Sequence, residues 1–229
     1  MKSKIRALLV LTIIIPMTSC NDWSVKTEEP LIDQRDGMEY QCKQIGDQIW
    51  MVENLAYQTI NKSPYYASDS AKYSTFGRLY FPSEIAEAVN IPGWHLPDTS
   101  EWLQLLEYYH LNEGNCGAGV NHTKCGEWEE KHYEDIETFL SNSPNGFNFQ
   151  LGGMWFLEWL NPSAKRQRSF KYMGSNGNYW ASPIDTNHLY THISFGRLKY
   201  YWMEISSKKP SSTNKSGDKF RFYLRLVKD

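Results

Sequence analysis

The clearest hydrophobic pattern of the chain lies just before its midpoint, in residues 98–109. Four apolar side chains recur there with the spacing i, i+3, i+4 and i+7: Trp102, Leu105, Leu106 and Tyr109. This period predicts an amphipathic helix that buries one face. Asp98 precedes the helix as a candidate N-cap, and Glu101, three residues later, can complete a capping box.

A rigid turn leads into this helix. Within residues 91–97, Pro92 and Pro97 fix φ and Gly93 relaxes it, so Trp94 and His95 are expected in a defined extended bend. We expect the rest of the chain to pack around this turn and helix.

Alternating polar and apolar positions predict antiparallel strands elsewhere. Residues 33–57 indicate a hairpin, with turns at Asp36-Gly37 and Gly46-Asp47. Further strands are predicted at 145–154, 188–195, 200–205 and 220–227, further helices at 82–89 and 128–140, and an exposed loop at 206–219. The second of these helices would turn four side chains inward: Tyr133, Ile136, Phe139 and Leu140. The whole pattern is typical of an α+β fold.

The first 20 residues have the features of an export signal. Three basic residues precede an apolar run, residues 7–15, that is too short to span a bilayer as a helix. The ending Met17-Thr-Ser-Cys20 resembles the lipobox of bacterial lipoproteins, in which the cysteine receives a diacylglycerol thioether and becomes the mature N-terminus. An ordinary signal peptide with a chance cysteine is the alternative. Acylation of Cys20 would anchor the protein to a membrane, which we expect to be the outer membrane of a bacterial cell envelope.

The remaining chain is expected to form a short polar tether, residues 21–32, and one domain, residues 33–229. Nine Trp and fifteen Tyr supply large side chains for its core. The formal net charge is −2, but residues 98–140 hold ten acidic and two basic side chains, whereas residues 165–229 hold thirteen basic and four acidic ones. Either these two oppositely charged segments form faces that attract each other within the molecule, or the basic segment offers a surface to an anionic ligand. Nucleic acid is not expected as a partner of an exported protein.

The cysteines predict one local disulfide. Because exported proteins enter an oxidising compartment, Cys116 and Cys125 are expected to pair and close a short loop, leaving Cys42 as a free thiol on a strand. A zinc site that adds His122 and His132 to the two cysteines is the alternative, but this spacing matches no common zinc pattern. No metal or other cofactor is therefore expected.

Five ordered motifs resemble the Fibrobacter succinogenes major paralogous domain (FISUMP) family, which occurs widely in Bacteroidota. They are RDGMEYQCKQIGDQIWMVENL at 35–55, FGRLY at 76–80, GWHLP at 93–97, GFNFQLGGM at 146–154 and GSNGNYWAS at 174–182. The motif positions singled out as structural are Trp50, Asn54, Gly93, Trp94, His95, Pro97, Trp102, Gly152, Gly153, Trp180 and Arg225. The resemblance implies a C-type-lectin-like fold, with a curled antiparallel sheet that pairs the two chain ends, about two main helices and long loops. It also implies a surface or secreted module.

The departure from the family that matters most involves two positions. Relatives usually carry cysteines where this sequence has Ile91 and Leu226, both apolar. If those cysteines pair in relatives, two apolar side chains can fill the same volume and keep the contact through packing. Ile91 and Leu226 are therefore expected to touch.

Two weaker signals have ordinary alternatives. Asp47, Glu53 and Asn54 could be metal or sugar ligands, but polar groups at a turn and a strand end more often satisfy backbone amides. Asp69-Ser70-Ala71 resembles the three-residue O-glycosylation signal of exported Bacteroidota proteins, although so short a signal also arises by chance.

Three function classes follow. The favoured one is a non-enzymatic, lipid-anchored binding module that contacts glycans or proteins through loops 112–126 and 206–219. The second is an enzyme like the formylglycine-generating sulfatase modifiers, which have a lectin-related core. That chemistry needs a pair of thiols in the terminal third, and no cysteine follows Cys125. A hydrolase is the third, but neither a nucleophile elbow nor an HExxH motif occurs.

Overall fold

The computed structural model describes residues 24–111, 123–128, 133–158, 167–182, 190–197, 201–208 and 219–229. Its α-helices are α1 (Ser70–Tyr73), α2 (Pro82–Ala88), α3 (Thr99–Tyr108) and α4 (Tyr133–Leu140), and its 3-10 turns are η1 (Tyr66–Ser68) and η2 (Ser74–Phe76). The strands are β1 (Lys26–Ile32), β2 (Glu39–Ile45), β3 (Gln48–Met51), β4 (Trp94–His95), β5 (Thr123–Trp128), β6 (Gly152–Glu158), β7 (Gln167–Met173), β8 (Asn176–Ala181), β9 (Tyr190–Arg197), β10 (Tyr201–Lys208), β11 (Phe220–Arg221) and β12 (Val227–Lys228). This mixture of helices and mainly antiparallel strands is the predicted α+β class.

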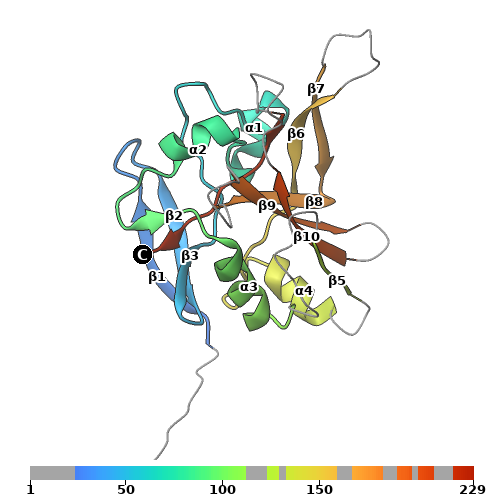
Figure 1. The fold of residues 1–229 in the computed structure, drawn as a ribbon. Coiled ribbons are helices and arrows are strands. Elements are labelled where there is room, and N and C mark those ends of the chain that lie inside the picture. The colour runs from blue at the N-terminus through green and yellow to red at the C-terminus, as the bar shows by residue number, and fades with distance from the viewer. Residues whose placement is uncertain are drawn as a thin grey trace, which may run out of the picture.

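Two sheets form the frame of the molecule (Figure 1). One contains five strands in the order β1-β2-β3-β12-β4. The other contains seven, with the path β11-β6-β8-β9-β10-β5 and β7 paired with β6. The single curled sheet that the resemblance implied is thus divided in two among the described residues.

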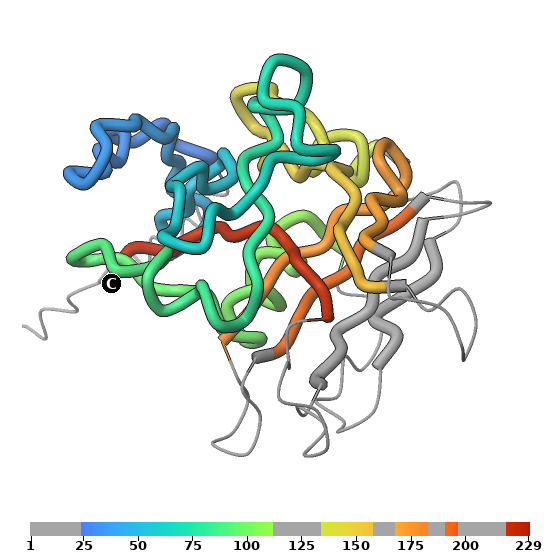
Figure 2. Tube along the Cα trace, turned by 90° about the horizontal axis from the view of Figure 1, so that it is seen from above, coloured from blue at the N-terminus to red at the C-terminus, as the bar shows by residue number. Residues whose placement is uncertain are grey.

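The last residues of the chain connect the two sheets. Strand β11 pairs with β6, whereas β12 lies between β3 and β4. Figure 2 shows this segment in red, crossing from the orange strands toward the blue N-terminal sheet. Residues 220–227 were predicted as one strand, and that prediction is wrong. Residues 221–227 are all buried and show no alternation of faces, because the segment runs from the edge of one sheet into the middle of the other.

The predicted central helix is confirmed as α3. The Asp98 carboxylate accepts a hydrogen bond from the Glu101 amide (2.9 Å), and the Glu101 carboxylate accepts one from the Asp98 amide (2.8 Å). This reciprocal pair is a capping box. The buried ring of Trp102 lies 5.0 Å from that of Trp50 and 6.0 Å from that of Phe147, measured between centroids. Helix α3 therefore fixes the turn before it to the larger core.

Two buried cations hold the segment that follows α4. The Arg225 guanidinium, fully buried, donates to Asn54 Oδ1 (2.8 Å), to the Phe147 carbonyl (2.9 Å) and to the Asn148 carbonyl. Lys43 donates through Nζ to two more carbonyls of this segment, at residues 143 and 146, at 2.7 Å each. Burial and the neighbouring Arg225 charge lower the pKa of Lys43. The turn at 143–148 is thus fixed by charge-assisted bonds to carbonyl oxygens, without a carboxylate among these acceptors.

Two glycines at the start of β6 allow a close approach of chains. A Cβ on Gly152 would lie 2.7 Å from the Tyr223 ring. Gly153 has a φ of +72°, and a Cβ there would lie 2.5 Å from the Lys171 carbonyl. Because a side chain fits at neither position, β6 can pack between the terminal segment and β7 only with glycine here.

Three element predictions were wrong at their boundaries. The strand expected at 145–154 begins only at Gly152, as β6, and residues 145–151 form no strand. Of the expected tether, residues 26–32 form β1, which pairs with β2. This strand has no apolar pattern in its sequence because main-chain hydrogen bonds hold an edge strand in place. Pro30 falls at the break in register between Glu28 and Leu31, where a strand tolerates proline. The second helix was expected from Trp128, but residues 123–128 form β5 and helix α4 begins at Tyr133.

Candidate functional site

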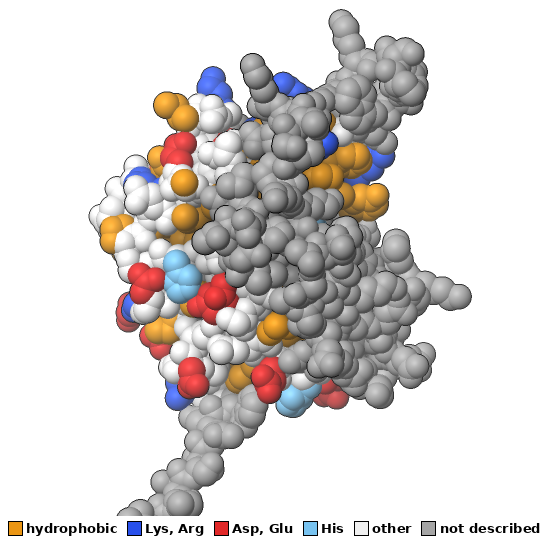
Figure 3. Space-filling view, viewed as in Figure 1, with side chains coloured by type: hydrophobic (Ala, Val, Ile, Leu, Met, Phe, Trp, Pro, Cys, Tyr) orange, Lys and Arg blue, Asp and Glu red, His pale blue; other side chains and the backbone are white. Residues whose placement is uncertain are grey.

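A cavity of about 590 Å³ opens between the loop at residues 61–68 and the outer part of the seven-stranded sheet. Its lining combines aromatic, apolar and cationic side chains: Asn61, Lys62, Pro64, Ser68, Phe81, Trp155, Leu157, Arg168, Phe170 and Arg221. A volume in the range of about 300–1,000 Å³ is typical of small-molecule sites. In the space-filling view, hydrophobic and basic side chains gather over β6 and β7 (Figure 3).

The strand register builds one wall of this cavity. Phe170 of β7 lies opposite Trp155 of β6, and Trp155 lies opposite Arg221 of β11 on its other side. Two residues further along, Arg168 lies opposite Leu157. Since side chains two apart on a strand share a face, all five point to the same side of β7, β6 and β11.

Arg221 is fixed within this wall. Its Nη1 lies 3.2 Å from Glu84 Oε2 and donates to the Leu79 carbonyl, also at 3.2 Å. The guanidinium carbon lies 3.8 Å from the centroid of the Phe81 ring. Glu84 is buried and also accepts from Thr59 Oγ1 (2.8 Å). Because its charge is paired and its plane is stacked, Arg221 presents a preorganised cation to the cavity.

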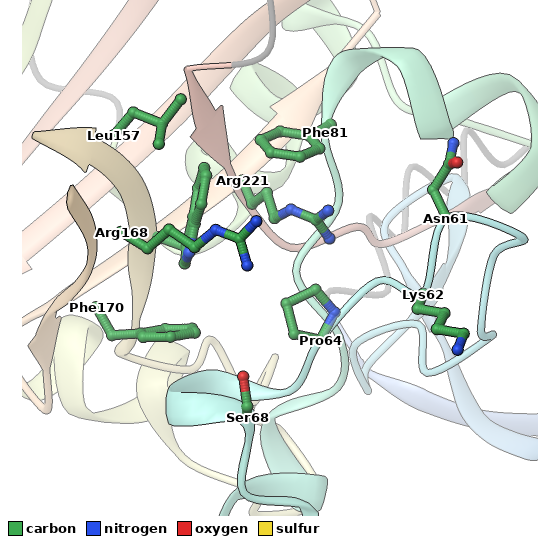
Figure 4. Close-up of a pocket in the computed structure, with 10 residues that line it drawn as sticks. Asn61, Lys62, Pro64, Ser68, Phe81, Leu157, Arg168, Phe170 and Arg221 are labelled. Atoms are coloured by element: carbon green, nitrogen blue, oxygen red, sulfur yellow. The ribbon is translucent and has the colours of Figure 1, made fainter. Parts of the chain in front are cut away.

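Arg168 is held differently. Its side chain is exposed, and no ion pair or hydrogen bond joins it to another described residue. Figure 4 shows the guanidinium groups of Arg168 and Arg221 pointing into the same cavity, whereas the ammonium group of Lys62 points away from it. Among the described residues, Glu84 is the carboxylate that contacts this pair of cations, so these side chains carry an excess of positive charge.

A second cluster lies at the turn before α3. His95 Nδ1 is 2.7 Å from Asp229 Oδ1, and His95 Nε2 is 2.9 Å from Glu101 Oε1. Burial would lower the pKa of His95, but the hydrogen bonds to the two carboxylates outweigh it and raise the pKa. The imidazolium thus joins the last residue of the sequence to the N-terminal turn of α3. Both ring nitrogens contact carboxylates, so the geometry suits a structural role in which His95 links Asp229 to α3.

The eleven predicted motif residues do not line the cavity. Trp50, Asn54, Trp102, Trp180 and Arg225 are buried in the cores, where Trp180 Nε1 donates to the Tyr80 carbonyl at 2.8 Å. The turn residues make backbone contacts instead: the carbonyls of Gly93 and Pro97 accept from the amides of Asp229 (3.0 Å) and Ser182 (2.9 Å), and Trp94 pairs with Lys228. Gly152 and Gly153 permit the close packing at β6.

The other candidate residues have plain structural roles or lie outside the described ranges. Glu53 accepts from the Gln41 amide (2.8 Å), as the backbone alternative expected, whereas Asn54 donates to the Phe76 carbonyl (2.8 Å) and accepts from Arg225. Cys42 is a buried free thiol, and burial raises its pKa to about 11. Cys20 and Cys116 lie outside the described residues, as do His122, His132 and most of the loops 112–126 and 206–219, so the lipid and the disulfide stay predictions. Among the residues that the structure describes, no group of three His, Cys, Asp or Glu side chains could hold a metal ion.

Sequence reasoning missed the cavity because its residues come from five separate segments. The available signals were the basic excess of residues 165–229 and the spacing of two residues that places Arg168 with Phe170, and Trp155 with Leu157, on one face of a strand. Neither indicates which strands are neighbours.

Fold and site together define a two-sheet α+β domain with a cavity at the edge of one sheet. The chain belongs to the Fibrobacter succinogenes major domain family, whose sequence model matches residues 44–228. No curated protein and no solved structure matches the chain. In the described residues, no helix has the length and apolar character needed to cross a bilayer.

Proposed function

We propose that this protein is an exported, lipid-anchored, non-enzymatic binding module that takes a glycan into the cavity bounded by β6, β7 and the loop at 61–68. The observation that carries the proposal is the lining of this cavity. Phe81, Trp155 and Phe170 line it with aromatic rings, and Arg168 and Arg221 place guanidinium groups beside them. Sugars present apolar C–H faces and polar edges, which such a combination suits.

The anchor rests on the N-terminal sequence. Cys20 ends a short export signal, and acylation there would tie the domain to the envelope, in our proposal to the outer membrane. A C-type-lectin-like fold also belongs to the proposal, supported by the family membership and by the presence of both ends of the domain in one sheet.

A protein ligand is the alternative within the same class. Protein interfaces usually bury about 800 Å² on each partner, over a broad surface. A cavity of about 590 Å³ is suited to a compact group instead. An enzyme of the formylglycine-generating type stays disfavoured because no thiol pair occurs in the terminal third of the sequence.

A glycan array tests the proposal. The protein, purified in detergent with its N-terminal lipid and then labelled, should bind a subset of immobilised glycans. A Phe170→Ser variant should lose that binding because it removes one apolar wall. Binding to no glycan, or binding that Phe170→Ser leaves unchanged, would contradict a glycan site in this cavity.

A further inference from the structure

We infer that the glycan in this cavity carries a carboxylate, so that the ligand is an acidic sugar such as a uronic or sialic acid residue. This inference rests on the proposed glycan-binding function and specifies its ligand class. The observation behind it is the unequal neutralisation of the two arginines that point into the cavity.

The charge of Arg221 is already balanced. Glu84 is buried against it at 3.2 Å, and its carboxylate also accepts from the Phe81 amide and from Thr59. Arg168, by contrast, forms no ion pair with a described residue. An anion that enters the cavity would therefore meet one cation that no described residue pairs with and a second that Glu84 already balances.

The geometry favours a carboxylate on a compact ring. A guanidinium donates two parallel hydrogen bonds to a carboxylate, a match that a neutral sugar hydroxyl does not offer. Phe170 and Leu157 lie beside Arg168 on the same face of the β6–β7 pair. A pyranose ring resting on this apolar surface would bring an attached carboxylate within reach of the Arg168 fork.

Paired ligands provide the test. The probes are trigalacturonate, trimannuronate and sialyllactose, each compared with its own methyl ester, which keeps the ring and removes the charge. Calorimetric titration of the lipidated full chain in detergent should show at least one acid bound about tenfold more tightly than its ester, as expected for loss of a charge-assisted pair.

Three variants locate the effect. Arg168→Met should weaken binding of that acid about tenfold and leave the ester unchanged, whereas Arg168→Lys should lose about threefold because the fork is gone but the charge remains. Lys171→Met is the matched control. Lys171 lies on the same strand three residues away, on the opposite face, with Nζ 5.2 Å from the Phe156 ring centroid. The Lys171→Met variant should bind the acid as tightly as the wild type does. Since Arg168 is exposed, both Arg168 variants should melt at the wild-type temperature.

The outcomes separate the two proposals. Equal binding of acids and esters would overturn the acidic specificity and leave glycan binding intact. Acid binding that Arg168→Met does not weaken, or that an Asp- and Glu-rich hexapeptide matches, would overturn the inference because charge would act elsewhere or without a sugar. Failure of all three acids, with other glycans bound on the array, would also overturn it. Failure of every glycan would remove the proposed function itself.

Discussion

Replacing Arg225 with methionine measures how much one buried cation contributes to this fold. The guanidinium donates to Asn54 Oδ1 and to the carbonyls of Phe147 and Asn148, and its central carbon lies 4.5 Å from the centroid of the Phe147 ring. Burial lowers the pKa of Arg225, although an arginine remains protonated in proteins. Methionine fills much of the volume but donates no hydrogen bond.

Two opposing effects decide the size of the change. The variant leaves three acceptors without this donor, at about 1–3 kcal/mol each. It also removes a desolvated charge, which recovers several kcal/mol. Because Arg225 hydrogen-bonds no carboxylate, its removal does not strand an opposite charge. The three acceptors together cost about 3–9 kcal/mol, and the recovered desolvation reduces this to a net loss of about 3–5 kcal/mol. That is a large part of the roughly 5–15 kcal/mol that stabilises a typical domain.

Urea unfolding followed by tryptophan fluorescence gives the free energy of unfolding. With a slope of about 2 kcal/mol/M, the midpoint should fall by about 1.5–2.5 M at unchanged slope. Arg78→Met is the control: Arg78 also donates to backbone carbonyls, those of Ala56 and Ser63, and stacks at 4.2 Å on Tyr65, but it is partly exposed. Water can hydrate the freed carbonyls there, so its loss should be about 1 kcal/mol. Equal losses for the two variants would refute the argument that burial sets the cost.

Three further predictions concern the turn before α3, the anchor and the departures from the family. The raised pKa of His95 means that its contribution to stability is fully present below about pH 6.5 and is lost as the pH rises through the folded-state pKa. Because the ring is partly exposed, His95→Gln should destabilise the protein by at most about 1 kcal/mol at pH 5.5 and by less at pH 8.5. A loss of stability that does not depend on pH would contradict this. Cys20→Ala should move the protein from the membrane fraction to the soluble fraction, whereas retention of the variant would exclude a lipid at that position. Ile91 and Leu226 are buried in the same hydrophobic cluster, so the double cysteine variant should oxidise in air and gain a few kcal/mol less any strain; a variant that stays reduced would show that the two residues do not touch.

Local signals predicted the parts of the fold whose cause is local. The helix α3, its capping box and its apolar face depend on residues within one or two turns of each other, so Asp98 and Trp102 could be placed from the sequence. Lys43 shows the limit of such reasoning. Alternation assigns it to the face opposite Tyr40 and Cys42, yet it is 7% exposed, because two carbonyls about a hundred residues away accept hydrogen bonds from its ammonium group.

The cavity could not be predicted for the same reason. Arg168 and Arg221 stand 53 positions apart, and they share a face only because β6 pairs with β7 on one side and with β11 on the other. The excess of basic residues in 165–229 indicated a charged surface but not which side chains meet. Nor could β1 be recognised, since its pairing partner and not its own apolar pattern holds it in place.

The motif residues and the cavity residues differ in how strongly a substitution would affect the stability of the fold. Trp50, Trp102 and Arg225 stabilise the cores, whereas Arg168 is exposed at the cavity, and a substitution at an exposed position usually changes stability by less than about 0.5 kcal/mol. Arg221 is constrained by buried Glu84, so changing it would leave a buried carboxylate without its partner. The cavity therefore combines one cation that the fold requires with one that can change freely. If the ligand differs among proteins with this scaffold, the change in specificity should occur first at position 168, because it can alter the charge of the cavity without cost to the core.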